Sequence, residues 1–119
     1  MGLAARHRGV MILVIVESPY AGDILANEAY ARRALADSLA RGEAPFASHL
    51  LYTQPGVLDD TDPAERAQGI AAGFAWGERA ELTAVYVDRG VTPGMAQGIR
   101  AARAVGRPVT FRFLDTDRS

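Results

Sequence analysis

The stretch "VMILVIVESPYAGD", residues 10–23, decides the fold class, because an apolar, largely β-branched run ends abruptly in polar residues. Residues 10–16 suit a central parallel strand that is buried on both faces. Glu17, Ser18 and Tyr20 then fill the junction before the next helix. Such a junction packs poorly, so its residues are better suited to a binding or catalytic site.

The rest of the chain alternates helical and strand patterns. Helices are predicted over 24–41, 63–79 and 92–106, and further strands over 45–52, 82–87 and 108–113. Alternation of this kind predicts an α/β fold of the Rossmann-like, flavodoxin-like class, with three layers. We expect a four-stranded parallel sheet in the order 2-1-3-4, with a crevice at the carboxyl ends of its strands.

Local signals support two of the helices. In the first, Leu25, Leu35 and Leu39 lie among alanines and are predicted to form its apolar face. In the second, Asp62 and Pro63 have the types preferred at an N-cap and at the first helical position. We therefore expect that helix to begin at Asp62.

Length and composition indicate one compact domain, since 119 residues are 49% hydrophobic and carry a net charge of −1. We expect the domain to span 10–114, with a flexible leader over 1–9 and a tail over 115–119. The longest apolar run is too short to cross a bilayer, so no membrane partner is expected. The absence of cysteine excludes disulfides and thiolate sites and favours a cytoplasmic protein.

The basic residues exclude several functions. The sequence has no lysine, which rules out Schiff-base chemistry and a P-loop lysine. Its arginines are spread along the chain among carboxylates, so we expect no nucleic-acid partner. No G-x-G-x-x-G motif follows the first strand, which argues against a dinucleotide dehydrogenase. We expect no cofactor and no metal.

The candidate site residues come from the loops at the expected crevice. Glu17 is either a catalytic carboxylate or a structural group that bonds loop backbone or an arginine. His49, predicted on the second strand, is either a structural histidine or a substrate contact. Turn residues at the start of the third helix favour anions and leave room for a ligand, although Thr92 could serve only as an N-cap. The remaining candidates for ligand contact are Ser18, Pro19, Tyr20, Ala21, Gln54, Asp60, Gly94 and Met95.

Three glycines, Gly69, Gly73 and Gly77, share one face of the predicted second helix. Each costs about 1 kcal/mol of helix stability relative to alanine, so something must approach this face closely. The alternatives are tight packing on the sheet or a helix, contact with a ligand, and an interface between copies of the chain.

The segments "ESPYAG", "GEAPFASHLLYTQ", "LDD", "AGFAW" and "GMAQGI" resemble small phage and prophage proteins of the DUF7768 and DUF4406-like families. These families are similar to the nucleoside 2-deoxyribosyltransferase superfamily, which includes 2′-deoxynucleoside 5′-phosphate N-hydrolases. The resemblance covers residues 12–114. It implies a small-molecule nucleoside or nucleotide as partner, and a homodimer or higher homo-oligomer.

The resemblance also locates where carboxylates are missing. The family's catalytic glutamate falls on Gly98, and a second family carboxylate falls on Gly73. Either Glu17 has replaced the missing glutamate or the chemistry has been lost. The expected function is therefore N-glycosidic bond hydrolysis or deoxyribosyl transfer, and the alternative is a non-catalytic protein that sequesters a nucleotide.

Overall fold

The computed structural model describes residues 11–115, so the predicted leader over 1–9 and the tail beyond Asp115 lie outside the described residues. The elements in chain order are β1 (Leu13–Glu17), α2 (Ile24–Ala40), β2 (Ala44–Phe46), α3 (Ser48–Leu51), α4 (Pro63–Gly77), β3 (Leu82–Tyr86), α5 (Pro93–Ala104) and β4 (Val109–Arg112). Within the described part of the chain, no helix is long and apolar enough to cross a membrane.

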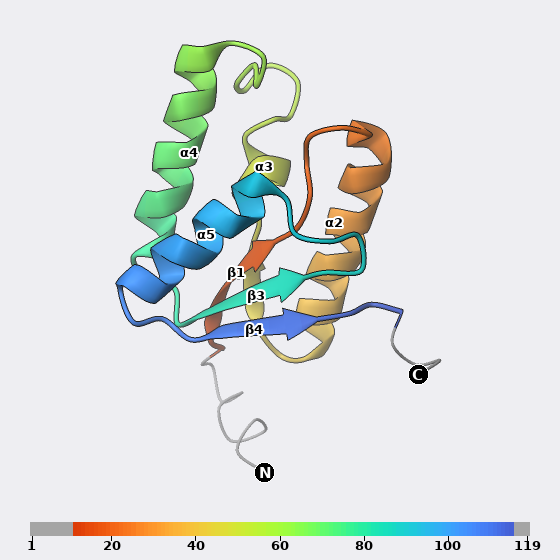
Figure 1. Cartoon of the computed structure of the whole chain (residues 1–119), viewed down its shortest axis with the longest axis vertical. Helices are drawn as coiled ribbons and strands as arrows, with labels where there is room; N and C mark the ends of the chain where they lie inside the picture. Colours follow the sequence, from red (N-terminus) through yellow and green to blue (C-terminus); the bar gives the residue numbers. More distant parts are fainter. Residues whose placement is uncertain (1–10, 116–119) are drawn as a thin grey trace.

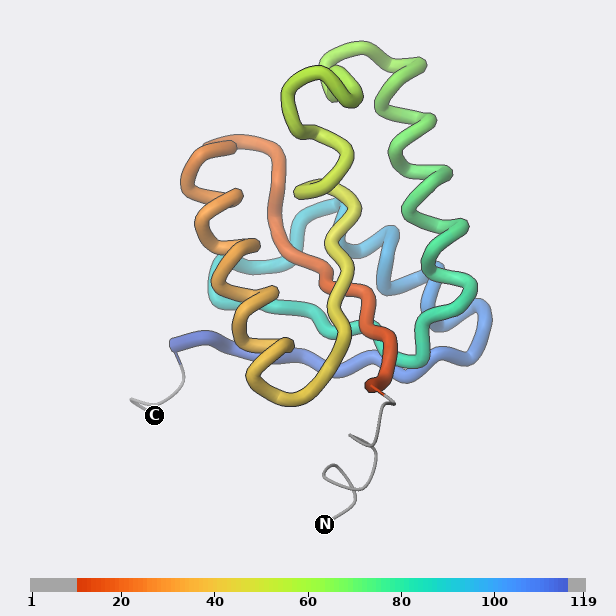
Figure 2. The backbone as a smooth tube through the Cα atoms, turned by 180° about the vertical axis from the view of Figure 1, so that it is seen from behind, coloured from red at the N-terminus to blue at the C-terminus, as the bar shows by residue number. Residues whose placement is uncertain are grey.

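The strands form one four-stranded, all-parallel sheet in the order β2-β1-β3-β4, which confirms the predicted fold class and strand order. The registers pair Val14 with Leu82 and Glu17 with Val85, so β1 and β3 run side by side at the centre. Helix α2 covers one face of the sheet, and α5 lies across the other (Figures 1 and 2). Consequently the carboxyl ends of β1 and β3 meet at one edge.

The two faces of β1 differ. Val14 and Val16 are buried against Tyr30 of α2 in the main core. Ile15 and Glu17 point to the opposite face and are only partly buried. The prediction that this strand is buried on both faces is therefore wrong. The physical reason is α4, which packs against α3 and leaves part of the sheet open.

The predicted apolar face of α2 is largely incorrect. Leu25 is 80% exposed and Leu39 is 56% exposed, whereas Leu35 packs at the edge of the core. The residues that α2 buries are small or polar and recur at helical spacing: Asn27, Tyr30, Ala31, Ala34 and Ser38. Small side chains bring the helix close to the sheet, and the two exposed leucines lie off that stripe.

The second strand is much shorter than predicted. It ends at Phe46, and residues 48–51 form the short helix α3, so His49 lies on a helix and not on a strand. Backbone bonds from Leu51 to Ala47 and from Tyr52 to Ser48 close this turn. Residues 49–51, "HLL", have a composition that is also found in strands, but the chain leaves the sheet after Phe46.

A buried ion pair links Glu43, which directly precedes β2, to Arg112 of β4. Arg112 donates to both carboxylate oxygens of Glu43, at 2.7 and 2.9 Å. Ser38 also donates to Glu43, and Tyr86 accepts a bond from Arg112 while donating to Asp37 of α2. Burial opposes ionisation of Glu43, but the bonds from Arg112 and Ser38 hold its pKa below the ordinary value. The network ties β2, β3, β4 and α2 together.

Replacing Glu43→Gln should lower the free energy of unfolding by about 3–5 kcal/mol, because it leaves the Arg112 charge buried without a counter-charge. Urea denaturation measures this loss. The control is Arg33→Gln, which breaks a pair with Asp115 in which both side chains are 54% exposed. That change should cost at most about 1 kcal/mol. Equal, small losses for both variants would contradict the structural role of the buried pair.

Candidate functional site

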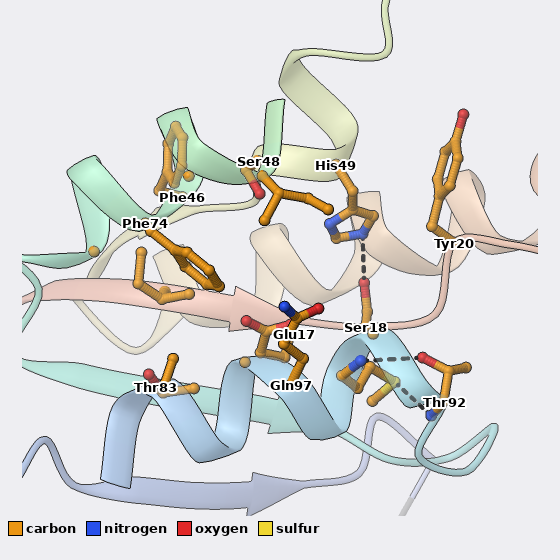
Figure 3. Close-up of a pocket in the computed structure, with 18 of the residues that line it drawn as sticks. Glu17, Ser18, Tyr20, Phe46, Ser48, His49, Phe74, Thr83, Thr92 and Gln97 are labelled. Carbon is orange, nitrogen blue, oxygen red and sulfur yellow. Dashed lines mark hydrogen bonds between the residues drawn. The ribbon is translucent and has the colours of Figure 1, made fainter. Parts of the chain in front are cut away.

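A cavity of about 540 Å³ lies between α4 and α5, over the face of the sheet that α2 does not cover (Figure 3). Ile15, Glu17 and Thr83 form its floor, while Phe74 of α4 and Gln97 of α5 line its walls. Its size is that of a typical small-molecule site. The cavity exists because α4 stands away from the sheet, with only Gly77 of its residues buried.

Glu17 lies near the middle of this cavity. In Figure 3 its carboxyl lies between a polar group of side chains, including Ser18 and His49, and an apolar group that includes Phe74. Burial raises the pKa of Glu17 to about 7, although the positive charge of Arg107 opposes this shift. The carboxyl therefore gains and loses its proton near neutral pH, as an acid–base group in a site requires.

Gly98 of α5 makes room for this carboxyl. A Cβ atom at residue 98 would lie 2.1 Å from Oε2 of Glu17 and 2.4 Å from its Cδ. Neither distance is compatible with a side chain at that position while Glu17 keeps its place. Glycine inside a helix costs stability, and here the contact with Glu17 accounts for it.

Ser18, His49 and Tyr20 form the polar end of the cavity. The Ser18 hydroxyl lies 3.0 Å from Nε2 of His49, and the Tyr20 ring meets the imidazole edge-on at a centroid distance of 5.9 Å. Burial lowers the pKa of His49 to about 4, against the opposing effect of Asp60. The histidine is thus neutral at pH 7 and can exchange hydrogen bonds without adding charge.

The loop after β1 is held by Asn27, which sequence reasoning missed. Its side-chain amide donates to the backbone carbonyls of Tyr20 and Ala21, both at 3.0 Å. Asp23 accepts a bond from the Ala26 amide and caps α2. The available signal was a polar side chain, Asn27, at a position of α2 that faces the sheet. These bonds fix the loop in position.

Helix α5 begins beside the polar end. Thr92 accepts a bond from the Met95 amide at 3.2 Å, so it is the N-cap, and it also lines the cavity. Met95 is 2% exposed and contributes a buried wall. Gly94 lines the cavity with space around its Cα, since the nearest atom to an added Cβ is Thr92 Oγ1 at 3.9 Å.

Most predicted site residues come together around this cavity. Two do not line it: Pro19 is buried beneath the loop, and Gln54 is exposed and donates to the Leu50 carbonyl at 2.7 Å. Asp60 lines the cavity and pairs with Arg66 at 3.0 Å. The predicted residues that line the cavity are Glu17, Ser18, Tyr20, Ala21, His49, Asp60, Thr92, Gly94 and Met95.

The glycine face of α4 is covered by the chain itself. A Cβ at Gly73 would lie 2.8 Å from Ser48 Oγ, and one at Gly69 would lie 3.3 Å from Leu58. These contacts support the packing interpretation of the glycines, and because Gly73 and Gly77 also line the cavity, their contact with a ligand stays a prediction. The suggestion that they form an interface between copies is wrong, because α3 and the following loop already occupy that face.

Sequence reasoning also missed Phe46, Phe74, Gln97 and Arg107, which line the cavity. Phe46 ends β2, so its position at the carboxyl edge was hidden by the overlong second strand. Arg107 donates to Thr83 at 3.2 Å and to the Gly77 carbonyl at 2.5 Å, and no local motif marks that role. Between residues 11 and 115, no three potential metal ligands are grouped as a metal site requires.

Comparisons with known proteins agree with this fold. The sequence profile of the family described as "Domain of unknown function (DUF7768)" matches residues 12–112. A solved structure from the characterisation of a 2-deoxyribosyltransferase of the psychrotolerant bacterium Bacillus psychrosaccharolyticus is similar, with a TM-score of 0.62 and 19% sequence identity. The match covers 88% of this chain and 74% of that chain. No curated protein gives a significant sequence match.

Replacing Gly98→Ala should push the Glu17 carboxyl out of its position, because the new methyl group would overlap it. The pKa of Glu17 should then fall from about 7 towards the ordinary value of 4.5 as the carboxyl reaches solvent. Carbon-13 NMR titration of labelled glutamate measures this change. Gly94→Ala on the same helix has space for its methyl group and should leave the titration unchanged. An unaltered pKa in Gly98→Ala would contradict the contact.

Proposed function

This chain belongs to the DUF7768 family, and we propose that it binds a nucleoside and breaks its N-glycosidic bond, by hydrolysis or by transfer of the sugar. The observation that carries the proposal is the carboxyl of Glu17, which lies in the middle of a small-molecule cavity and whose pKa burial raises to about 7. The fold shared with a 2-deoxyribosyltransferase supports the same conclusion, although it bears on architecture alone.

Cleavage of this bond develops positive charge on the sugar. As the C1′–N bond breaks, its electron pair stays on the base nitrogen, which takes a proton from solvent. A water oxygen, or a nitrogen of a second base, then bonds to C1′ and loses its own proton. An ionised carboxylate beside C1′ stabilises the charge that develops between these events. Glu17 is the group that we assign to this role.

The position of Glu17 supports its assignment to the role of the family's glutamate. The resemblance places that glutamate at residue 98, and the Glu17 carboxyl lies where a side chain of residue 98 would begin. A carboxylate on β1 would thus lie in the same part of the cavity as one carried by α5. Gly73 offers no second carboxylate, because Ser48 occupies the space beside it.

The polar end of the cavity suits an uncharged sugar. Ser18, Tyr20, His49 and Thr92 supply hydroxyl and imidazole groups that can bond sugar hydroxyls. Pro93 has no N–H and the Met95 amide already donates to Thr92, so among residues 93–95 Gly94 alone keeps a backbone N–H for a phosphate.

The charges around the cavity favour the same ligand. Of the two arginines that line it, Arg66 is paired with Asp60. Arg107 is held by neutral acceptors, the Gly77 carbonyl and the Thr83 hydroxyl, and Thr83 lies on the side away from Ser18 and His49 (Figure 3). His49 is neutral, and the acidic Asp60 is close to it. We infer that nucleosides bind better than their 5′-phosphates. The homo-oligomer expected from the family resemblance stays a prediction.

Replacing Glu17→Gln should slow base release from nucleosides at least about 100-fold, since it removes the carboxylate while keeping the side-chain shape. Chromatography of a nucleoside panel after incubation measures this. For the wild-type protein, kcat/KM should rise with pH through about 7, the pKa at which Glu17 loses its proton.

Glu28→Gln is the matched control, because Glu28 lies on α2 and does not line the cavity. It should release base at the wild-type rate. Nucleosides that raise the melting temperature of the wild-type protein but stay intact would overturn the catalytic proposal in favour of a binding protein. Base release that survives in Glu17→Gln would instead remove Glu17 from the mechanism.

A 5′-phosphate on the ligand should weaken binding about tenfold or more, because the polar end offers neutral hydroxyl and imidazole groups and its arginine, Arg66, is paired with Asp60. Calorimetric titration of Glu17→Gln with a nucleoside and with its 5′-monophosphate measures the ratio without turnover. Tighter binding of the monophosphate would contradict the neutral-sugar assignment.

A further inference from the structure

The cavity has a second, apolar end that the sugar contacts do not use. On the side of Glu17 away from Ser18 and His49, Figure 3 shows the Phe74 ring directed towards Glu17 and Phe46 farther from it, and both residues line the cavity. The other apolar residues that line the cavity are Ile15, Ile70, Ala101 and Val105. Phe74 remains 44% exposed and Ile70 36% exposed, so this surface has no protein partner within the described chain.

Phe46 is held rigidly by its neighbours. Its ring lies 5.4 Å from the ring of Trp76, tilted by 31°, and 6.2 Å from that of Tyr52 in an edge-on arrangement. Aromatic pairs at these distances fix one another's orientation. A ring that is already oriented loses little freedom when a flat ligand packs on it, which favours binding.

Some polar groups that line the cavity are already bonded within the protein. The Thr83 hydroxyl accepts a bond from Arg107, and the same arginine donates to the Gly77 carbonyl. Ser48, Glu78 and Gln97 also line the cavity with polar side chains, so the apolar residues of this lining outnumber the groups that could recognise the edge of a nucleobase. Discrimination between bases depends on such groups, because an apolar pocket distinguishes ligands of similar shape only weakly.

We propose that this apolar end is the subsite for the leaving group, and that it selects flat aromatic groups by stacking and apolar contact more than by hydrogen bonds. The substrate class is then N-glycosides whose aglycone is an apolar aromatic ring system, of which benzimidazole is a simple probe. The assignment of a leaving group rests on the proposed function, but the binding of the ring does not.

The position of Glu17 supports this division of the cavity. Its carboxyl lies between the polar end and the apolar end, and the bond that is broken joins a hydroxyl-rich sugar to a ring. A substrate that spans the cavity with its sugar at Ser18 and His49 would present its C1′ to Glu17. Its ring would then extend towards Phe46 and Phe74.

The test uses benzimidazole and uracil, each titrated into the Glu17→Gln protein by calorimetry. Benzimidazole should bind at least tenfold tighter than uracil. Phe74→Ala should weaken benzimidazole at least fivefold, whereas Phe111→Ala, on a β4 side chain that is 49% exposed and does not line the cavity, should not. Trp76 is the sole tryptophan, so quenching of its fluorescence should accompany binding beside Phe46.

Equal affinity for the two probes, or unchanged benzimidazole binding in Phe74→Ala, would overturn the subsite. Phe46→Leu gives a second, independent variant should Phe74→Ala unfold, and circular dichroism distinguishes lost binding from lost structure. Benzimidazole binding with no base release from any nucleoside would remove the proposed reaction and leave the subsite intact. Base release together with preferred binding of uracil would support the proposed reaction and remove the apolar subsite.

Discussion

The arrangement of the site depends on the contact between the carboxyl of Glu17 and the backbone of Gly98. One group comes from the central strand and the other from the helix that crosses it, so the contact sets how closely α5 approaches β1. It also buries the carboxyl, and this burial raises its pKa to about 7. Position, burial and acidity of Glu17 thus have a common physical origin.

The cavity itself depends on a different close approach. Gly73 allows α4 to pack on Ser48 of the short helix α3, and this packing holds α4 over the sheet without closing onto it. The space left between α4 and α5 is wide enough for a ligand, and its floor is the half-exposed face of β1. A larger residue at position 73 would overlap Ser48 and push α3 and α4 apart.

The fold was predictable because its signals are local. A β-branched run, the cap at Asp62 and the turn before α5 identify each element from a few neighbouring residues, and alternation then implies a parallel sheet. The loops at the carboxyl edge followed from that topology. The end of β2 at Phe46 was not predictable, because "HLL" has the same composition in a strand and in a helix.

The details of the site depend on tertiary packing that leaves no local pattern. The proximity of Gly98 to Glu17 joins residues on different elements, and so do the contacts of Arg107 with Thr83 and Gly77. The leucines of α2 show the same limit, since Leu25 and Leu39 have core composition and are exposed. The buried face of α2 is the one whose alanines, Ala31 and Ala34, allow the helix to approach the sheet closely.

The buried pair of Glu43 and Arg112 also affects the order in which the chain can fold during synthesis. Its two members are 69 positions apart, and Arg112 belongs to the last strand. While the ribosome still holds that strand, Glu43 has no counter-charge, and docking β2 against α2 would bury an isolated carboxylate at a cost of several kcal/mol. The nascent chain therefore completes this part of its core only after β4 has emerged, so the sheet is not stabilised strand by strand.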